Sequence, residues 1–381
     1  MKNFIFQNPT KLLFGRGMIA KLASEIPADK KIMLTFGGGS VKQNGVYSQV
    51  KDALKNHTCI EFWGIEPNPK VATLRRAVAL GKAEKVDFLL SVGGGSVLDG
   101  TKLISAAIPY GGDAWDLVLD STRITDAVPY ADVITLPATG SEMNRGAVIS
   151  NEETQEKYAF YSTYPQFSIL DPETAFTLPP YQIACGIADT FVHVMEQYLV
   201  DANNSPLMDR WAESILQTLI EIAPHLRANS RDYDQMANFM LAAAMALNGF
   251  IAMGVATDWA THQIGHEITA LTGLTHGETL VIIEPALMRV MKNEKRQKLL
   301  QYAERVWYIA ETDDDKKIEA AIVCTEDFFR SLPLRTRLSE CAIAEDITRQ
   351  IVERLHKRNA RMGENGSITA DVVREIFEKC K

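Results

Sequence analysis

The sequence lacks the features that mark membrane-spanning and disulfide-stabilised proteins. None of its apolar runs approaches the roughly 18 residues that a membrane-spanning helix needs. The N-terminal stretch MKNFIFQNPTKLLFG is too polar for a secretory signal. The five cysteines lie far apart and form no CxxC pair, a pattern that favours a reducing cytosol over a disulfide framework. We therefore expect a cytoplasmic protein with no membrane partner.

The sequence also has fewer basic than acidic residues. The chain carries 40 lysines and arginines against 48 acidic residues, for a formal net charge of -8, and no basic block stands out. A nucleic-acid partner would require a clustered basic face, so we expect none. The 381 residues, 46% of them hydrophobic, are ample for a large core and suggest about two domains.

Short apolar runs alternate with helical stretches in the first half of the chain. The expected strands are KIMLTF (31–36), CIEF (59–62), DFLLSV (87–92) and VITLP (133–137). The expected helices between them lie at about 46–56 and 71–85. Such alternation is typical of a parallel α/β sheet, which binds ligands at the carboxyl ends of its strands.

The pattern changes near Leu178-Pro179-Pro180, where strand signals fade. Apolar residues then follow helical spacing over 211–220 and again over 236–247. We predict an α/β domain with a parallel sheet over residues 1–180 and an all-helical domain over residues 181–381.

Two glycine-rich turns follow expected strands. In GGGSVLDGTK (93–102), glycines allow the backbone to approach a pyrophosphate, and the N–H groups of the next helix then face the anion. The spacing does not match the GxGxxG fingerprint, so a tight turn that merely needs glycine remains an alternative. In the earlier turn, Gly38, Gly39 and Ser40 offer room and donors where a carboxylate would repel a 2′-phosphate, which favours NADP(H). A simple loop remains the alternative there, and Lys42 could add charge.

Four of the seven histidines belong to one pattern. Asp189 and His193 are four residues apart in a helical stretch, as are His262 and His266, and His276 follows His262 by 14 residues. Residues four apart share one helix face, and imidazole with carboxylate suits Zn²⁺, Fe²⁺, Ni²⁺ or Mn²⁺. Each piece alone is also compatible with a surface pair or a buried core histidine, but their concentration in two apolar windows favours a metal site.

The motifs together resemble the iron-containing, or group III, alcohol dehydrogenases, especially their NADP(H)-dependent aldehyde reductase and butanol dehydrogenase branch. The resemblance extends over essentially the whole chain and is carried by the segments GGGSVK, GIEPNP, GGGSVLDGTK, TLPATGSE, ILDPE, DTFVHVMEQY, DWATHQIGHE and HGETL.

The resemblance implies a role for each matching residue. The metal ligands are Asp189, His193, His262 and His276, and the proton relay is His266. The cofactor-binding residues are Gly38, Gly39, Ser40, Asn68, Gly94, Gly95, Ser96, Asp99, Thr139, Ser141 and Lys157. NAD-preferring relatives carry an aspartate at Gly38-Gly39, so NADP(H) is expected over NAD(H), although some NADH-linked relatives also carry GGGS.

The implied fold is a dinucleotide-binding α/β domain plus an all-α metal-binding domain, in the architecture of dehydroquinate synthase, with the active site in the cleft between them. The implied function is hydride transfer between NADP(H) and a small primary alcohol/aldehyde pair such as butanol and butanal, with one divalent metal, Fe²⁺ or Zn²⁺ first. A homodimer is expected from the family. A lyase-like enzyme related to dehydroquinate synthase, a glycerol dehydrogenase-like enzyme and a binding protein with a vestigial site remain alternatives.

Overall fold

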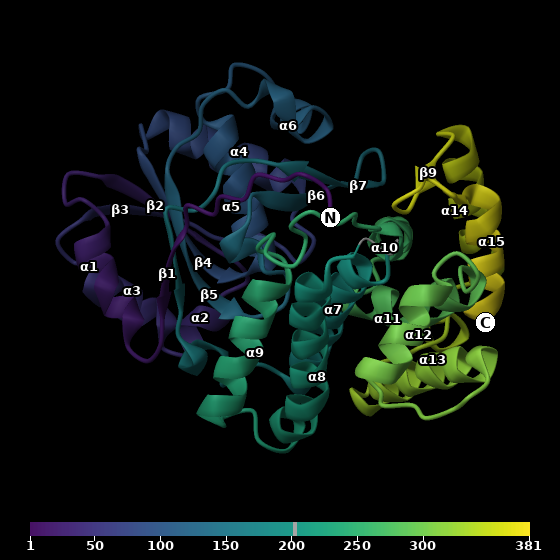
Figure 1. The fold of residues 1–381 in the computed structure, drawn as a ribbon. Helices are drawn as coiled ribbons and strands as arrows, with labels where there is room; N and C mark the ends of the chain where they lie inside the picture. Colours follow the sequence, from purple (N-terminus) through teal and green to yellow (C-terminus); the bar gives the residue numbers. More distant parts are fainter. Residues whose placement is uncertain (201–203) are drawn as a thin grey trace. The chain divides into compact units, whose positions relative to one another are not determined.

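The computed structural model describes residues 1–200 and 204–381, and the chain divides into two compact units (Figure 1). The sheet unit comprises Gln7–Leu178 and Asn229–Ala244, and the helical unit comprises Met1–Phe6, Pro179–Ala228 and Met245–Lys381. Both units are discontinuous in sequence, and the single boundary at residue 180 stays a prediction. No helix in the described ranges is long and apolar enough to cross a lipid bilayer.

Six parallel strands form the main sheet in the described part of the sheet unit. Their order is β1-β8-β5-β4-β2-β3. The strands are β1 (Lys11–Phe14), β2 (Lys31–Phe36), β3 (Thr58–Phe62), β4 (Phe88–Gly94), β5 (Tyr130–Leu136) and β8 (Phe167–Leu170). The chain passes from β2 to β3 on one side and from β4 to β5 on the other, so the direction switches between β2 and β4. Ligands of parallel sheets bind at the carboxyl ends of the strands at such a switch.

Helices cover both faces of this sheet, which confirms the predicted parallel α/β class. Ile32 and Leu34 of β2 join an apolar core with Val50 of α3, while Thr35 Oγ1 lies 2.6 Å from Thr101 Oγ1 of α5 on the other face. Figure 1 accordingly shows α1 and α3 on one side of the strands, with α4 and α5 on the other. The helical elements are η1 (Met18–Lys21), α1 (Leu22–Glu25), α2 (Ser40–Gln43), α3 (Val46–Ala53), α4 (Val71–Ala83), α5 (Gly95–Ala107), α6 (Ala114–Leu119), η2 (Ser121–Arg123), η3 (Ser141–Met143), η4 (Pro172–Ala175) and most of α9 (Tyr233–Ala246).

An antiparallel hairpin of β6 (Gly146–Asn151) and β7 (Glu156–Tyr161) adds to the sheet unit. Ser150 N donates to Pro69 O at 2.9 Å, and Lys70 forms a bridge with Ser150. These contacts attach the hairpin to the GIEPNP turn.

The helical unit packs around the buried helix α11. This helix contacts α7, α10, α13 and α15. The described helical elements are α7 (Pro180–Tyr198), α8 (Pro206–Ala228), α10 (Ala260–Thr272), α11 (His276–Val290), α12 (Arg296–Arg305), α13 (Asp314–Ser331), η5 (Ser339–Cys341), α14 (Glu345–Lys357) and α15 (Ala370–Lys379). A short hairpin of β9 (Arg361–Met362) and β10 (Ile368–Thr369) is the one departure from helix in this region as described. The predicted helical second half is thus confirmed.

Candidate metal centre and nucleotide-binding turns

Three helices of the helical unit bring the expected metal residues together. Asp189 and His193 lie one turn apart on α7, His262 lies in the first turn of α10, and His276 is the first residue of α11. Asp189, His193 and His262 are buried, and His276 is half-buried. Because α7, α10 and α11 pack against one another, residues that are 87 positions apart in the sequence reach one point.

Three imidazole nitrogens approach one carboxylate oxygen. The Oδ1 atom of Asp189 lies 3.5 Å from Nε2 of His262, 3.7 Å from Nε2 of His193 and 3.8 Å from Nε2 of His276. These separations are close to the roughly 3.3 Å between neighbouring ligands of a tetrahedral zinc ion with bonds of about 2.0 Å. Nε2 of His262 is buried and has no hydrogen-bond partner among the described residues. The residues present therefore fit a divalent cation.

Glu196 holds the His262 ring in place, and sequence reasoning did not single it out. Its Oε2 atom contacts Nδ1 of His262, while its Oε1 atom accepts from the backbone N–H of Thr261 at 2.6 Å. A carboxylate at Nδ1 fixes the tautomer and leaves Nε2 free to bind a metal. Glu196 lies seven residues after Asp189 and therefore on the same face of α7, and this spacing was the available signal.

The buried carboxylates of Asp189 and Glu196 influence the charge of the neighbouring histidines. Burial lowers the pKa of His193 to about 4, although Asp189 raises it, so this imidazole is neutral at pH 7 as a metal ligand must be. Burial also disfavours charge on His262, but Glu196 and Asp189 outweigh it and raise the pKa of His262 to about 10. The centre thus favours a positive charge, which a proton or a divalent cation can supply.

His266 lies at the edge of this cluster. Its ring centroid is 5.0 Å from that of His276 and 6.3 Å from that of His262. The side chain is half-buried, in contrast to the fully buried His262 one turn earlier. Its distance and partial exposure are compatible with exchanging protons rather than with binding the same ion.

In the sheet unit, the glycine turn at Gly93–Gly95 packs against the ATGSE turn. Gly94 ends β4, and Gly95 and Ser96 begin α5. A Cβ atom at Gly95 would lie 2.4 Å from Oγ1 of Thr139, so only glycine allows this approach. Gly94, Gly95, Ser96 and Thr139 therefore meet at the carboxyl ends of β4 and β5.

Asp99 and Lys102 hold the ATGSE turn in place. Both oxygens of Asp99 are engaged, accepting from Ser141 Oγ at 2.7 Å and from Val148 N at 2.9 Å. Lys102 is fully buried and donates to Ser141 O and to Gly146 O, each at 2.7 Å. Burial lowers the pKa of Lys102 to about 8, although Asp99 and other carboxylates raise it. Sequence reasoning missed this lysine, and its place three residues after Asp99 was the only signal.

Two further expected cofactor residues meet at the base of the hairpin. Nζ of Lys157 on β7 donates to Oδ1 of Asn68 in the GIEPNP turn at 2.9 Å. Asn68 has a φ of 55°, in the left-handed region that asparagine tolerates better than most residues. Lys157 is buried, so its contact with Asn68 fixes the ammonium beside the turn.

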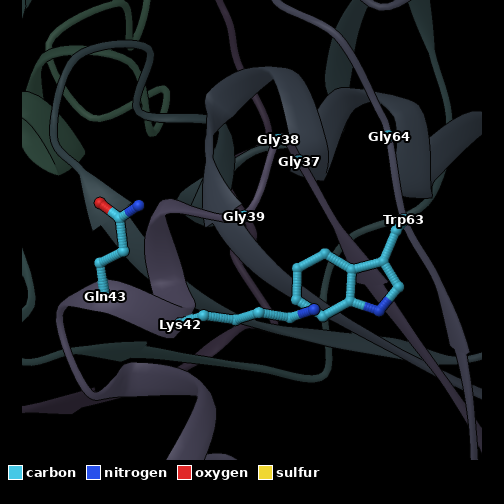
Figure 2. A pocket seen from close by; sticks show the side chains of 7 residues that line it. All are labelled: Gly37, Gly38, Gly39, Lys42, Gln43, Trp63 and Gly64. Carbon is cyan, nitrogen blue, oxygen red and sulfur yellow. The ribbon is translucent and has the colours of Figure 1, made fainter.

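The first glycine turn borders a pocket of about 450 Å³ (Figure 2). The residues that line it are Gly37, Gly38, Gly39, Lys42, Gln43, Trp63 and Gly64. No carboxylate occurs in this lining as the structure describes it, and a Cβ atom at Gly38 would meet nothing within 4 Å. Ser40 follows directly at the start of α2 and is exposed. The room and the missing carboxylate agree with space for a 2′-phosphate.

Comparisons with known proteins match the whole chain. The family model for iron-containing alcohol dehydrogenase matches residues 9–172, and that for the C-terminal region of the Fe-containing alcohol dehydrogenase family matches residues 183–380. The chain is 49% identical to the NADPH-dependent aldehyde reductase YqhD of Escherichia coli strain K12, with 100% of both chains covered. It is 41% identical to the probable NADH-dependent butanol dehydrogenase 1 of Bacillus subtilis strain 168, with 99% of both covered.

Solved structures agree with these matches. The crystal structure of Escherichia coli K-12 YqhD superposes with a TM-score of 0.98 at 49% identity, covering 100% of this chain and 99% of that chain. The NADH-dependent butanol dehydrogenase A of Thermotoga maritima gives a TM-score of 0.95 at 36% identity, with 100% and 99% covered.

Fold and matches together define the class of this protein, which is an oxidoreductase. The chain belongs to the iron-containing alcohol dehydrogenase family. The predicted family, the dehydroquinate synthase-like fold class and the predicted alcohol dehydrogenase or aldehyde reductase activity are thereby confirmed. Membership favours redox chemistry over a lyase reaction or a role limited to binding.

Proposed function

We propose that the chain uses NADPH and one divalent cation to reduce small aldehydes such as butanal to primary alcohols. The observation that carries the proposal is the approach of three imidazole nitrogens to Oδ1 of Asp189, at 3.5, 3.7 and 3.8 Å. The substrate class is supported by similarity to relatives named as an aldehyde reductase and a butanol dehydrogenase. The preference for NADPH over NADH is supported by the pocket at Gly38, which lacks a carboxylate.

In this proposal, Asp189, His193, His262 and His276 hold the cation, with Fe²⁺ or Zn²⁺ favoured and Ni²⁺ or Mn²⁺ also compatible. The cation supplies Lewis-acid polarisation of a carbonyl oxygen, and the reduced nicotinamide supplies the hydride. Glu196 keeps Nε2 of His262 aimed at Asp189. Protonated His266, or a water that it holds, donates the proton that the product alcohol gains, and the same group takes that proton back in the reverse direction.

The sheet unit binds the dinucleotide in the same proposal. Backbone N–H groups of Gly94, Gly95 and Ser96 face the pyrophosphate. The hydroxyl of Thr139 donates to it, and Ser141, whose hydroxyl proton goes to Asp99, lines the same site. Asp99 acts by fixing Ser141. Lys157 contributes positive charge to the phosphates, Asn68 lies on the adenosine side, and Gly38, Gly39 and Ser40 receive the 2′-phosphate. Residues 1–180 then serve as the dinucleotide-binding domain, and residues 181–381 as the metal-binding domain.

We further propose a cytoplasmic homodimer. The five cysteines are all free thiols, as a reducing compartment would keep them. Three consecutive apolar side chains near the N-terminus, Phe4, Ile5 and Phe6, are 48%, 99% and 41% exposed, and a second copy of the chain could cover them. Light scattering coupled to size-exclusion chromatography tests the dimer, and a monomeric mass at working concentration would contradict it.

The activity is tested by following nicotinamide absorbance with butanal and a series of other aldehydes, using NADPH and NADH in parallel. The proposal expects turnover with short aldehydes, a higher kcat/KM for NADPH, loss of turnover after chelation, and recovery on adding back Fe²⁺ or Zn²⁺. An inert protein under every metal loading would contradict it.

A further inference from the structure

Trp63 is fixed at the pocket beside the first glycine turn. Its ring stacks on Phe36 with centroids 4.1 Å apart and planes 14° apart. Its Nε1 atom donates to Oε2 of Glu61 at 2.9 Å, and the ring of Tyr47 lies 5.6 Å away. Stacking on one face and a hydrogen bond at the edge leave the indole with one orientation. Trp63 thus presents a rigid wall rather than a mobile surface side chain.

The ammonium of Lys42 lies over this indole. Nζ of Lys42 is 4.0 Å from the centroid of Trp63 and 5.7 Å from that of Tyr47, and Figure 2 shows the lysine side chain extended toward the indole with its nitrogen at the ring. Because Phe36 already stacks on one face of the indole, the cation must occupy the other. Aromatic faces attract cations in this geometry.

The carboxylate that binds the Trp63 indole does not neutralise Lys42. Glu61 is instead engaged by Tyr47 OH at 2.9 Å, by Lys51 Nζ at 3.0 Å and by the Trp63 indole. Within the described ranges of the chain, Lys42 forms no ion pair. The pocket therefore contains a positive charge that is held in place, is exposed to solvent and remains available to an anion.

This arrangement suits a phosphate monoester. A lysine ammonium binds phosphate as a point charge, and its flexible four-carbon stem ordinarily loses rotamer freedom when it does so. The indole reduces that loss, because it restricts the stem before the ligand arrives. The glycines at 37–39 add no side chain that would exclude the ligand from the space beside the ammonium.

We propose that Lys42 is the cation that recognises the 2′-phosphate of NADP(H), and that Trp63 is a positioning residue that holds Lys42 toward it. The inference rests on the proposed function, since it assumes that the adenosine end of NADP(H) occupies this pocket. It adds two specificity-determining residues to the turn formed by Gly38, Gly39 and Ser40.

The test measures the affinity of the full-length protein for adenosine 2′,5′-bisphosphate and for adenosine 5′-monophosphate by calorimetry, without aldehyde. The affinity ratio of these two probes reports the 2′-phosphate alone. Wild type should favour the bisphosphate by about tenfold or more, and Lys42→Met should reduce that ratio about tenfold, as expected for one charge-assisted contact. Lys55→Met removes an exposed lysine elsewhere in the sheet unit and should leave the ratio unchanged.

Two substitutions separate positioning from structural support. Trp63→Leu should lower the ratio several-fold with little change in the affinity for the monophosphate, and Trp63→Phe, which keeps an aromatic face, should retain most of the wild-type ratio. Equal weakening of both probes by Trp63→Leu would show a structural role and overturn the positioning claim. An unchanged ratio in Lys42→Met would overturn the whole inference.

The affinity ratio of the two probes is measured separately from aldehyde turnover, so the inference and the proposed function can fail independently. If the wild-type protein reduces aldehydes with NADPH but Lys42→Met leaves the probe ratio unchanged, the inference is overturned and the proposed function stands. If the wild-type protein reduces no aldehyde but Lys42→Met lowers the probe ratio, the phosphate site stands and the proposed function is overturned.

Discussion

Replacing Glu196 with glutamine removes the negative charge that faces Nδ1 of His262 and changes almost nothing in volume. The Oε1 atom of Glu196 accepts from Thr261 N at 2.6 Å and from His262 N at 3.2 Å, so the first turn of α10 depends on it as well. The glutamine amide has a single oxygen, so it cannot accept hydrogen bonds both from these backbone N–H groups and from Nδ1 of His262. If its oxygen keeps the backbone contacts, its NH₂ group faces Nδ1 and shifts the ring proton to Nε2. If its oxygen faces Nδ1, the NH₂ group faces the backbone donors.

The first arrangement puts a proton on the nitrogen that lies 3.5 Å from Oδ1 of Asp189, where the cation would bind. Loss of such an outer carboxylate typically weakens metal binding about 10- to 100-fold, which is about 1.4 to 2.8 kcal/mol. We therefore expect Glu196→Gln to bind Zn²⁺ about 10- to 100-fold more weakly than wild type, with kcat reduced when the metal is limiting. Competition against a chromophoric chelator measures the affinity directly.

Glu221→Gln is the matched control, since Glu221 is an exposed carboxylate on α8 of the same unit. It should bind Zn²⁺ as wild type does. Thermal unfolding of both variants separates a local effect on the centre from a loss of fold. Tight metal binding by a folded Glu196→Gln protein would refute the reasoning that this carboxylate orients His262.

Three further substitutions follow from the geometry. His276→Ala should abolish both bound metal, by elemental analysis, and turnover; a variant with full metal and normal rate would remove His276 from the ligand set. Gly38→Asp introduces a carboxylate where a Cβ atom meets nothing within 4 Å, so it should raise KM for NADPH about 10- to 100-fold and change KM for NADH little; equal effects on both would contradict the 2′-phosphate assignment. Gly95→Ala forces a Cβ atom to 2.4 Å from Thr139 Oγ1. It should therefore lower the free energy of unfolding, measured in urea, by about 1–3 kcal/mol. Gly111→Ala is the control and should leave that free energy unchanged, because its Cβ atom would have nothing within 4 Å.

Periodicity predicted the elements that are long or buried on both faces. The run at 31–36 matches β2, and the helical spacings at 211–220 and 236–247 fall within α8 and at α9, although Leu247 lies just beyond the end of α9. Strands β1 and β8 are four residues each, too short for a period to show. The β6–β7 hairpin does alternate in burial over Gly146–Asn151, but its polar Ser150 and Asn151 weaken that signal.

Tertiary contacts determine the features of the site that the sequence pattern could not predict. A lysine in a helix is ordinarily exposed, yet Lys102 is fully buried because residues 141–146 supply its acceptors. Trp63 lies between the expected strand at 59–62 and the GIEPNP segment and was part of neither, and its importance depends on Phe36 and Lys42 reaching the same ring. The metal residues were named from spacing and resemblance, but only the packing of α7, α10 and α11 brings Asp189, His262 and His276 within reach of one ion. Nε2 of His193 lies 3.7 Å from Asp189 Oδ1, at the side of this group.

A stepwise titration of the metal-free protein with Zn²⁺ or Fe²⁺, with bound metal and butanal reduction by NADPH followed together, tests the link between this cluster and catalysis most directly. Activity should rise in proportion to bound metal and reach its plateau at one ion per chain, and Asp189→Asn should neither bind that ion nor gain activity. Full turnover before any metal is added, or an active Asp189→Asn protein, would contradict it.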